Sequence, residues 1–509
     1  MNLFVFYFFS NTSFAVSSST SSPSSNSQQF TYSSEDKVTF SAGLAEERST
    51  RENLVGVMSA DLNQMRSIRM FFSDERETSG QLVIASCESQ YKIFHFHNGG
   101  LDRLSSILKS YQNCSEKSQY REDTGLCFEF SVSSLTLPYS DCHKEEGKYA
   151  KLTREMWLQY ISENGVIEND KELRKHVFFG GVDQSIRREV WPFLLHYLSF
   201  QLTTAERAEI CRVKAKQYHE IQKRRGSMSE ADMEVFWRTI QTIVDKDVVR
   251  TDRNNPFFKG ESNPNLQLMR SILLNYAVYN PIVGYMQGMS DLLGPLLVEL
   301  RNESDAFWCF VGLMHATIFI SSPTDDDMEL QLMLVRELIK IFCQDFYQHL
   351  DFMGDDSLEL LFCHRWILLC FKREFYEQDA LRIWECCWSR YETDYFHLFV
   401  CVAIIKIYGD DVYQKNLSAD DVLLHFNTLA MHMSVDLVLK VARGLVYQFK
   451  TLTTIPCVLQ TMYQSADLYT TSLPINVICV HRNNHSSNFS TCPFDKQKIT
   501  SVKNYFKVN

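Results

Sequence analysis

Two short segments of this chain carry side chains whose types and spacing suit chemistry. In the first, VDKDVVRT, Asp247 and Arg250 lie three residues apart, so they share one face of a helix and can pair. In the second, GYMQG, the uncharged amide of Gln287 precedes a strongly apolar run. A guanidinium binds negative charge without losing its proton, and an amide can accept one proton of a water molecule.

Each of these residues also has a purely structural interpretation. Asn254, Asn255 and Pro256 follow Arg250 and predict a turn, so Arg250 can be an arginine that favours the dipole at a helix C-terminus. Gln287 can be an amide that satisfies backbone groups near the start of a helix. Spacing alone therefore leaves both interpretations open.

The elements around these segments are predicted to be helical. Thr203 with Glu206 has capping-box spacing, and Ser229 with Asp232 repeats a similar helix start. Apolar residues then recur at helical steps in three runs. These runs are Met233, Phe236, Trp237, Ile240, Val244 and Val248; Met289, Leu292, Leu293, Leu296, Leu297 and Leu300; and Met328, Leu332, Val335, Ile339 and Phe342. Strand patterns are almost absent there, so we predict an all-α domain over residues 150–450 and a loosely ordered tail over 451–509.

The region before this domain differs in composition. Residues 1–36 are Ser-rich and are expected to form a disordered leader. Residues 60–136 predict a small β-rich module, with strands in QLVIAS, YKIFHFH and CFEFSVSSL and a helix in LDRLSSILKSY. The apolar start MNLFVFYFF lacks a basic n-region and is soon interrupted by polar residues, so we expect no signal peptide.

Composition excludes several classes of protein. The net charge of −11 provides no broad basic field for nucleic acid. The 15 cysteines show no C-x-x-C pairs and are odd in number, which favours free thiols in a reducing compartment. The longest apolar run after the start of the chain, Leu398 to Ile405, is too short to cross a bilayer. We therefore expect a soluble cytoplasmic protein.

Other chemical sites find little support. His95 and His97 fall on one face of a predicted strand, but a metal site needs three or four convergent ligands and no third candidate is near. Two half-buried strand histidines are the expected outcome. The chain has neither a G-x-x-x-x-G-K-[ST] loop nor a G-x-S-x-G elbow. We expect no metal and no nucleotide bound by this chain itself.

Considered together, the segments resemble the TBC-domain proteins, which are GTPase-activating proteins for Rab GTPases. The run at 244–251 resembles the family's I-x-x-D-x-x-R motif, with Val244 in place of the usual Ile, and GYMQG resembles its Y-x-Q-G motif. VFFGGVDQSIRREVWPFLL resembles the opening block and includes Arg187 and Trp191. NYAVYNPIVGY, FKREF and LRIWECCW match further blocks in the family's order, so the resemblance covers roughly residues 170–450.

The resemblance implies a site made of two fingers that complete the active site of a partner. Arg250 would stabilise the charge that develops on GTP, and Gln287 would orient the attacking water. The expected supporting residues are Asp247, Tyr285, Gly284 and Gly288, with Arg187 and Trp191 as scaffold. GTP and Mg²⁺ would be held by the Rab protein in its GTP form, so no cofactor is expected in this chain.

In one subgroup of the family the N-terminal module is a PH-like or Rab-binding region, which is what the resemblance implies for residues 60–136. The short Ser-rich stretch before it leaves its completeness open. Peripheral association with endosomal membranes, through the partner or this module, is implied in the same way. The alternative function is a non-catalytic Rab-binding scaffold in membrane trafficking. The sequence does not identify the Rab.

Overall fold

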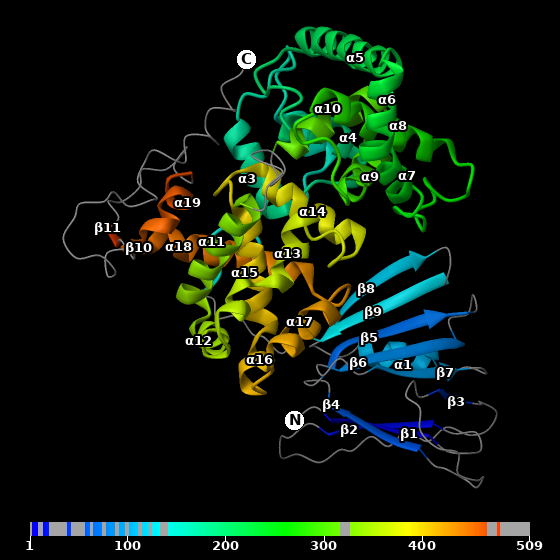
Figure 1. Cartoon of the computed structure of the whole chain (residues 1–509). Coiled ribbons are helices and arrows are strands. Elements are labelled where there is room, and N and C mark those ends of the chain that lie inside the picture. The colour runs from blue at the N-terminus through cyan, green and yellow to red at the C-terminus, as the bar shows by residue number, and fades with distance from the viewer. Residues whose placement is uncertain are drawn as a thin grey trace. The chain divides into compact units, whose positions relative to one another are not determined.

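The computed structural model describes residues 3–8, 14–19, 38–41, 56–61, 65–73, 78–86, 91–96, 101–109, 114–121, 125–132, 141–315, 326–465 and 476–478. The contacts within it divide the chain into two units, which are described separately. One comprises residues 1–137 with 432–434, and the other comprises residues 138–431 with 435–509. Figure 1 shows the first unit as a set of strands and the second as a set of helices.

The strands of the first unit form two antiparallel sheets. One has the order β2-β1-β4 and the other the order β3-β7-β6-β5-β9-β8. The strands are β1 (Leu3–Phe8), β2 (Phe14–Ser19), β3 (Val38–Ser41), β4 (Gly56–Asp61), β5 (Met65–Phe72), β6 (Gly80–Ser86), β7 (Tyr91–Phe96), β8 (Cys114–Arg121) and β9 (Gly125–Val132). Helix α1 (Leu101–Lys109) contacts β5, β6 and β8 of the larger sheet (Figure 1).

Alternate residues of the central strands are buried, as a sheet with one covered face requires. Ile68, Met70 and Phe72 of β5 are almost inaccessible to solvent, and so are Leu101 and Leu104 of α1. The strands expected at QLVIAS, YKIFHFH and CFEFSVSSL and the helix expected at LDRLSSILKSY are therefore present as β6, β7, β9 and α1. Of the histidine pair considered for a metal, His97 lies outside the described residues.

The start of the chain differs from the expected leader. Within residues 1–36 the structure places β1 and β2, and β1 pairs with both β2 and β4. The run LFVFYF consists of residues with high strand propensity, which accounts for β1 better than the overall Ser content does. The other positions of the predicted leader lie outside the described residues. The larger sheet also includes β3, upstream of residue 60, where the module was expected to begin.

The second unit is helical, so the expected all-α domain is confirmed. Its helices begin before residue 160 and continue past residue 450. They are α2 (Arg154–Gln159), α3 (Asp170–Gly180), α4 (Arg187–Leu194), α5 (Thr204–Gly226), α6 (Glu230–Phe236), α7 (Thr242–Val248), α8 (Pro264–Tyr279), α9 (Met289–Leu300), α10 (Glu303–Met314), α11 (Asp326–Phe342), α12 (Gln344–Met353), α13 (Leu361–Leu368), α14 (Glu377–Ser389), α15 (Phe396–Tyr408), α16 (Asp410–Gln414), α17 (Ala419–Thr428), α18 (Val435–Thr451) and α19 (Gln460–Ser465). Short 3-10 turns lie at η3 (Gln184–Ile186), η6 (Asp355–Glu359) and η7 (Cys457–Leu459), and η4 (Trp237–Gln241) is a π-helical turn.

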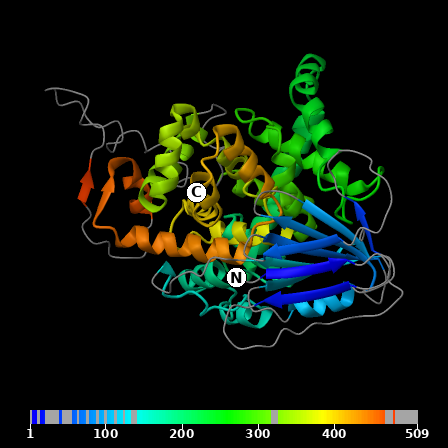
Figure 2. The ribbon, with the colours of Figure 1, turned by 90° about the horizontal axis from the view of Figure 1, so that it is seen from below.

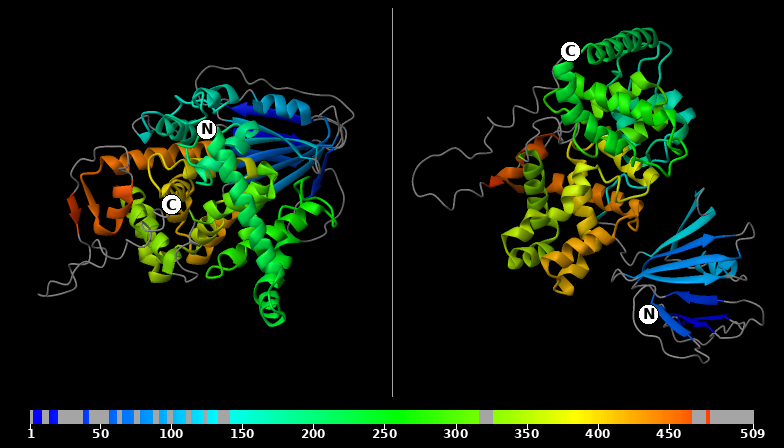
Figure 3. Two further views of the ribbon diagram at one scale, coloured as in Figure 1. Left: turned by 90° about the horizontal axis from the view of Figure 1, so that it is seen from above. Right: turned by 45° about the vertical axis from the view of Figure 1, so that its right-hand side comes forward.

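The helical unit has two lobes (Figures 1 and 3). Helices α4 to α10 form one lobe and α11 to α18 the other. Helix α14 joins them, because it contacts α3 and α4 on one side and α15 and α18 on the other. Figure 2 shows α18 as a long orange helix that leads toward β10. Across the described residues, no helix combines the length and the apolar character needed to span a membrane.

The two helix starts for which caps were predicted have those caps. The hydroxyl of Thr203 accepts from the Glu206 amide, and the Glu206 side chain accepts from the Thr203 amide, which completes the predicted capping box of α5. Ser229 caps α6 by accepting from the Asp232 amide.

The helix expected across Met233 to Val248 is instead interrupted by the π-helical turn η4. The hydroxyl of Thr242 donates to the carbonyl of Trp237 at 2.8 Å within this turn. Because the wider turn shifts the phase of the helix, Trp237 is 52% exposed while Val244 is buried. Trp237 therefore departs from the predicted apolar face, whereas the other five residues of the run are buried or half-buried.

The region after residue 450 is more ordered than predicted over its first part. Strand β10 (Thr454–Pro456) pairs in parallel with β11 (Asn476–Ile478). Ile455, Leu459 and Met462 are buried, so this part of the predicted tail belongs to the helical unit. Residues 466–475 and 479–509 lie outside the described residues.

We expect Gly312→Ala to lower the free energy of unfolding by about 1–3 kcal/mol. Gly312 lies within α10, and a Cβ added there would be 1.9 Å from the carbonyl oxygen of Leu195 at the end of α4. Gly226→Ala, in the last turn of α5, is the matched control because a Cβ added there meets nothing within 4 Å. It should be neutral or stabilising by up to about 1 kcal/mol. Denaturant unfolding of both variants tests this, and equal effects would contradict the close contact.

Candidate functional site

The residues Asp247 and Arg250 lie at the end of α7 and form the expected ion pair. Both Nε and Nη2 of Arg250 donate to Oδ1 of Asp247, at 3.1 and 2.6 Å. The side chain of Asp247 is buried, whereas that of Arg250 is 56% exposed. The hydrogen bond to Asp247 raises the pKa of Arg250, and the nearby charge of Asp291 contributes to the same shift. Arg250 is therefore a permanent cation fixed at one edge.

The segment around Gln287 is attached to the same carboxylate. The hydroxyl of Tyr285 donates to Oδ2 of Asp247 at 2.8 Å, and the amide of Gly288 donates to the same oxygen at 3.1 Å. Burial and the bond to Asp247 raise the pKa of Tyr285 above its usual value, so the phenol remains a donor. The structure thus brings the two predicted motifs together through one buried side chain.

Gln287 lies between these two anchors and faces solvent. Its side chain is exposed and makes no hydrogen bond to the part of the chain that the structure describes. Likewise, Nη1 of Arg250 makes no hydrogen bond within that part. One guanidinium edge and one side-chain amide are therefore available to an external group. An amide that satisfies backbone groups at a helix start would be hydrogen-bonded to them. Gln287 makes no such bond to the described residues.

The two glycines beside Gln287 have backbone conformations that favour glycine. Gly284 has φ +62° and Gly288 has φ +100°. A Cβ at Gly288 would also lie 2.7 Å from the side chain of Leu369. This gives an internal reason for glycine at the start of α9.

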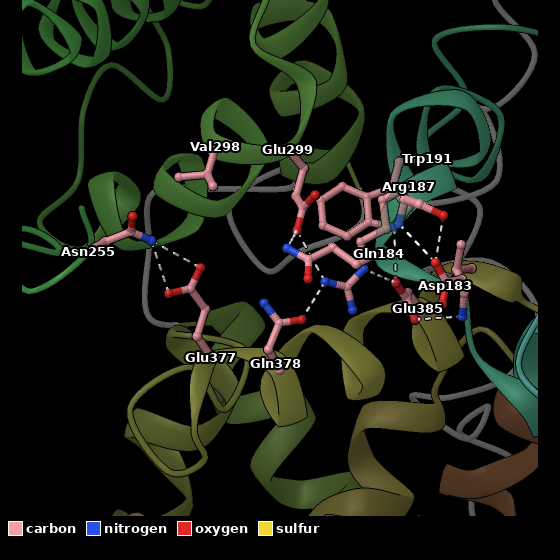
Figure 4. Close-up of polar contacts among 12 residues, drawn as sticks. Asp183, Gln184, Arg187, Trp191, Asn255, Val298, Glu299, Glu377, Gln378 and Glu385 are labelled. Atoms are coloured by element: carbon pink, nitrogen blue, oxygen red, sulfur yellow. Dashed lines mark hydrogen bonds and ion pairs between the residues drawn. The ribbon is translucent and has the colours of Figure 1, made fainter. Parts of the chain in front are cut away.

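Arg187 and Trp191 lie in the core and contact a different acid. Nε of Arg187 donates to Glu385 at 2.8 Å, and Nε1 of Trp191 donates to the same oxygen at 3.2 Å (Figure 4). Nη1 of Arg187 also bonds Glu299 and Gln378, so one side chain connects α4, α9 and α14. Burial raises the pKa of Glu385, and its three donors offset that cost. This is the placement that a scaffold role requires.

Several ionic contacts near the site were not identified from the sequence. Lys372 bonds Asp252 at 2.5 Å, and Arg373 bonds Asp291 at 2.8 Å. Their only signal was the charged pair within FKREF, and the acids lie 120 and 82 residues away in the chain. Spacing cannot predict such long-range pairs.

The turn that follows Arg250 also contacts the first turn of α14. The amide nitrogen of Asn255 lies 3.4 Å from a carboxylate oxygen of Glu377 (Figure 4). Burial raises the pKa of Glu377. Asn255, predicted only as a turn residue, therefore also joins its segment to α14.

The described residues contain no group of three or more His, Cys, Asp or Glu side chains arranged to hold a metal ion. The side chains that the site presents at its surface are a guanidinium, Arg250, and an amide, Gln287.

Replacing the shared carboxylate should be far more costly than replacing its neighbour. We expect Asp247→Ala to lower the free energy of unfolding by about 2–4 kcal/mol, because the buried donors of Tyr285 and Gly288 lose their acceptor. Asp245→Ala is the matched control, since Asp245 lies on α7 and also pairs with an arginine, Arg270, but is 41% exposed. Its expected cost is about 0–1 kcal/mol. Similar losses in urea unfolding would refute the central role of Asp247.

Comparison with known proteins supports the domain assignment. Residues 184–413 match the family described as the Rab-GTPase-TBC domain. The chain is 57% identical over 414 residues to TBC1 domain family member 16 of Homo sapiens, covering 81% of this chain and 54% of that protein. It is 36% identical over 307 residues to TBC1 domain family member 17 of Mus musculus, covering 60% of this chain and 47% of that protein.

More distant relatives agree. The chain is 32% identical over 318 residues to GTPase-activating protein GYP7 of Yarrowia lipolytica, covering 58% of this chain and 43% of that protein. The chain thus spans about half the length of the curated relatives it matches. The fold matches the crystal structure of the Ypt/Rab-GAP domain of Gyp1p with a TM-score of 0.50 and 20% identity, over 58% of this chain and 98% of that one. Residues 184–413 of the helical unit therefore form a Rab-GTPase-TBC domain.

Proposed function

We propose that this chain accelerates GTP hydrolysis by a Rab GTPase, with Arg250 and Gln287 completing the partner's active site. The observation that carries the proposal is an exposed guanidinium bonded to buried Asp247, together with an exposed amide, Gln287, whose neighbours Tyr285 and Gly288 bond the same carboxylate. The relatives named GTPase-activating proteins and the fold of a Ypt/Rab-GAP domain support the choice of partner.

Arg250 has the properties that phosphoryl transfer requires of a finger. Hydrolysis of GTP spreads negative charge over the transferred phosphoryl oxygens and the leaving oxygen. Nε and Nη2 of Arg250 are held by Asp247, so the Nη1 edge can donate to that charge without rearrangement. Such fingers contribute about 10³–10⁵ in rate, which corresponds to roughly 4–7 kcal/mol of barrier.

Gln287 would hold the attacking water in line with the phosphorus. Its carbonyl can accept one proton of the water while its NH₂ group donates to another acceptor, which neither a carboxylate nor an ammonium can do. The anchors on both sides, Tyr285 and Gly288, limit the positions that the amide can take. In this assignment the chain provides the glutamine, and the partner holds GTP and Mg²⁺.

The surface beside the fingers suits a protein partner. Val249, next to Arg250, is 64% exposed, and Ile282, close to Gln287 in the chain, is 81% exposed. Exposed aliphatic side chains beside the two polar groups are typical of a surface that another protein covers. This supports a macromolecular partner over a small substrate.

We also propose that the first unit is a PH-like or Rab-binding module, which the antiparallel sheet with helix α1 supports. A cytoplasmic location and peripheral association with endosomal membranes, through this module or through the Rab partner, complete the proposal.

Arg250→Ala should lower the single-turnover rate of GTP hydrolysis with a responsive Rab by about 10³–10⁵-fold. Because the guanidinium is exposed, the cooperative unfolding transition should be retained. Arg212→Ala is the matched control, since Arg212 is a 68% exposed arginine that pairs with Glu209 at the same three-residue spacing. A rate for Arg250→Ala equal to that of the control would exclude the arginine assignment.

Gln287→Ala should lower the same rate by about 10²-fold or more, because the water loses its positioning group. The loss should be smaller with a Rab whose own glutamine can take over. Gln217→Ala, which removes an exposed amide from α5, should have no effect. A panel of Rab proteins loaded with GTP provides the measurement. If wild-type chain binds a Rab without accelerating any of the panel, the function is that of a non-catalytic scaffold.

A further inference from the structure

Lys372 and Arg373 are adjacent in the chain, yet their side chains bind acids on two different segments. Lys372 Nζ lies 2.5 Å from Oδ2 of Asp252, in the turn that follows Arg250. Arg373 Nη2 lies 2.8 Å from Oδ2 of Asp291, in the first turn of α9. One dipeptide therefore contacts both of the segments that carry the proposed fingers.

The backbone before this dipeptide is held in an unfavourable conformation. Cys370 and Phe371 are consecutive non-glycine residues with φ of +48° and +63°. Buried groups fix both residues: the indole of Trp384 donates to the Cys370 carbonyl at 2.6 Å, and the Phe371 amide donates to the Trp366 carbonyl at 2.8 Å. An unfavourable backbone conformation persists only where the surrounding contacts stabilise it. Such conformations are concentrated at functional sites. This turn fixes the directions in which the two cations leave the backbone.

Arg373 is connected to the segment of Gln287 through Asp291. Asp291, which Arg373 binds, donates its backbone amide to the carbonyl of Gly288 at 3.0 Å. Leu369, from the same turn as Arg373, lies against Gly288, where an added Cβ would be 2.7 Å from a methyl group of Leu369. Gln287 immediately precedes Gly288, so the conformation of its backbone depends on these two contacts.

Lys372 is connected to the segment of Arg250 through Asp252. Asp252 follows Arg250 by two residues and has a left-handed backbone, with φ +47°. Its carboxylate lies between Lys372 and Gly294 of α9, where an added Cβ would be 2.4 Å from Oδ2. The Lys372 side chain is only 7% exposed, so this ion pair is largely shielded from solvent. The position of the turn after Arg250 therefore depends on it.

We propose that Lys372 and Arg373 are positioning residues for the two fingers, with Lys372 fixing the segment of Arg250 and Arg373 fixing that of Gln287. This rests on the proposed function of the two fingers in GTP hydrolysis. The proposal assigns each cation to one finger. A general contribution to folding would instead affect both finger segments alike. A different role for Arg373, whose side chain is 53% exposed, would be a direct contact with the partner.

Amide hydrogen exchange of the full chain tests the positioning without any GTPase. Arg373→Ala should increase exchange about 10-fold or more at residues 285–291, whereas Lys372→Met combined with Asp252→Asn should do so at residues 250–255. The double substitution avoids leaving an unpaired buried carboxylate. Arg382→Ala, which removes a partly exposed partner of Asp436 elsewhere in the helical unit, is the control. Exchange that is unchanged, or that increases equally in both segments, overturns the proposal.

Double-mutant kinetics then test the link to each finger. Arg373→Ala should lower kcat by about 10–100-fold at unchanged KM, and should cost little more when Gln287→Ala is already present. The Lys372 and Asp252 variant should be similarly non-additive with Arg250→Ala. Arg373→Lys should restore part of the kcat.

These experiments distinguish a failure of the proposed function from a failure of the positioning role. A wild-type chain that accelerates no Rab overturns the proposed function, whatever the exchange shows. An active wild type whose Arg373→Ala variant keeps its kcat, or only raises KM, overturns the positioning role alone. Equal losses in the presence and absence of Gln287 also overturn it.

Discussion

The carboxylate of Asp247 is the interaction on which the site depends. It is buried, and a buried carboxylate is tolerated only when its oxygens are bonded to donors. One oxygen binds Arg250, and the other binds Tyr285 and the Gly288 amide. Because the donors come from two segments, the requirement to satisfy one charge fixes the arginine and the glutamine relative to each other.

The acids beside the two segments are paired with cations. Asp252 and Asp291 bind Lys372 and Arg373, as Asp247 binds Arg250. Another buried acid of the domain, Glu385, contributes to the scaffold in the same way by binding Arg187.

The helical class, the two capped helices and the ion pair of Asp247 with Arg250 were predicted from the sequence, because each of these depends on local patterns. The finger roles of Arg250 and Gln287 came from the family resemblance and stay a prediction. Thr203 with Glu206 and Asp247 with Arg250 are pairs at three-residue spacing, which a helix converts directly into contacts. The sequence did not predict the π-helical turn before α7, where the hydroxyl of Thr242 donates to the carbonyl of Trp237. Nor could it predict the pairs of Lys372 and Arg373, whose partners depend on how distant helices pack.

In the proposed function, the exposure of Arg250 and Gln287 has a physical cost that the rest of the domain offsets. An isolated arginine on a turn would sample many rotamers, and ordering it at the moment of reaction would raise the barrier. Holding Nε and Nη2 on a buried acid removes most of that freedom before the partner arrives, yet leaves Nη1 unbonded within the described residues. Gln287 has no such side-chain bond, so its order must come from its backbone, between Tyr285 and Gly288. Arg250, held at one edge of its guanidinium, and Gln287, held only through its backbone, therefore need different supports. In our proposal Lys372 provides the first by binding Asp252, and Arg373 provides the second by binding Asp291.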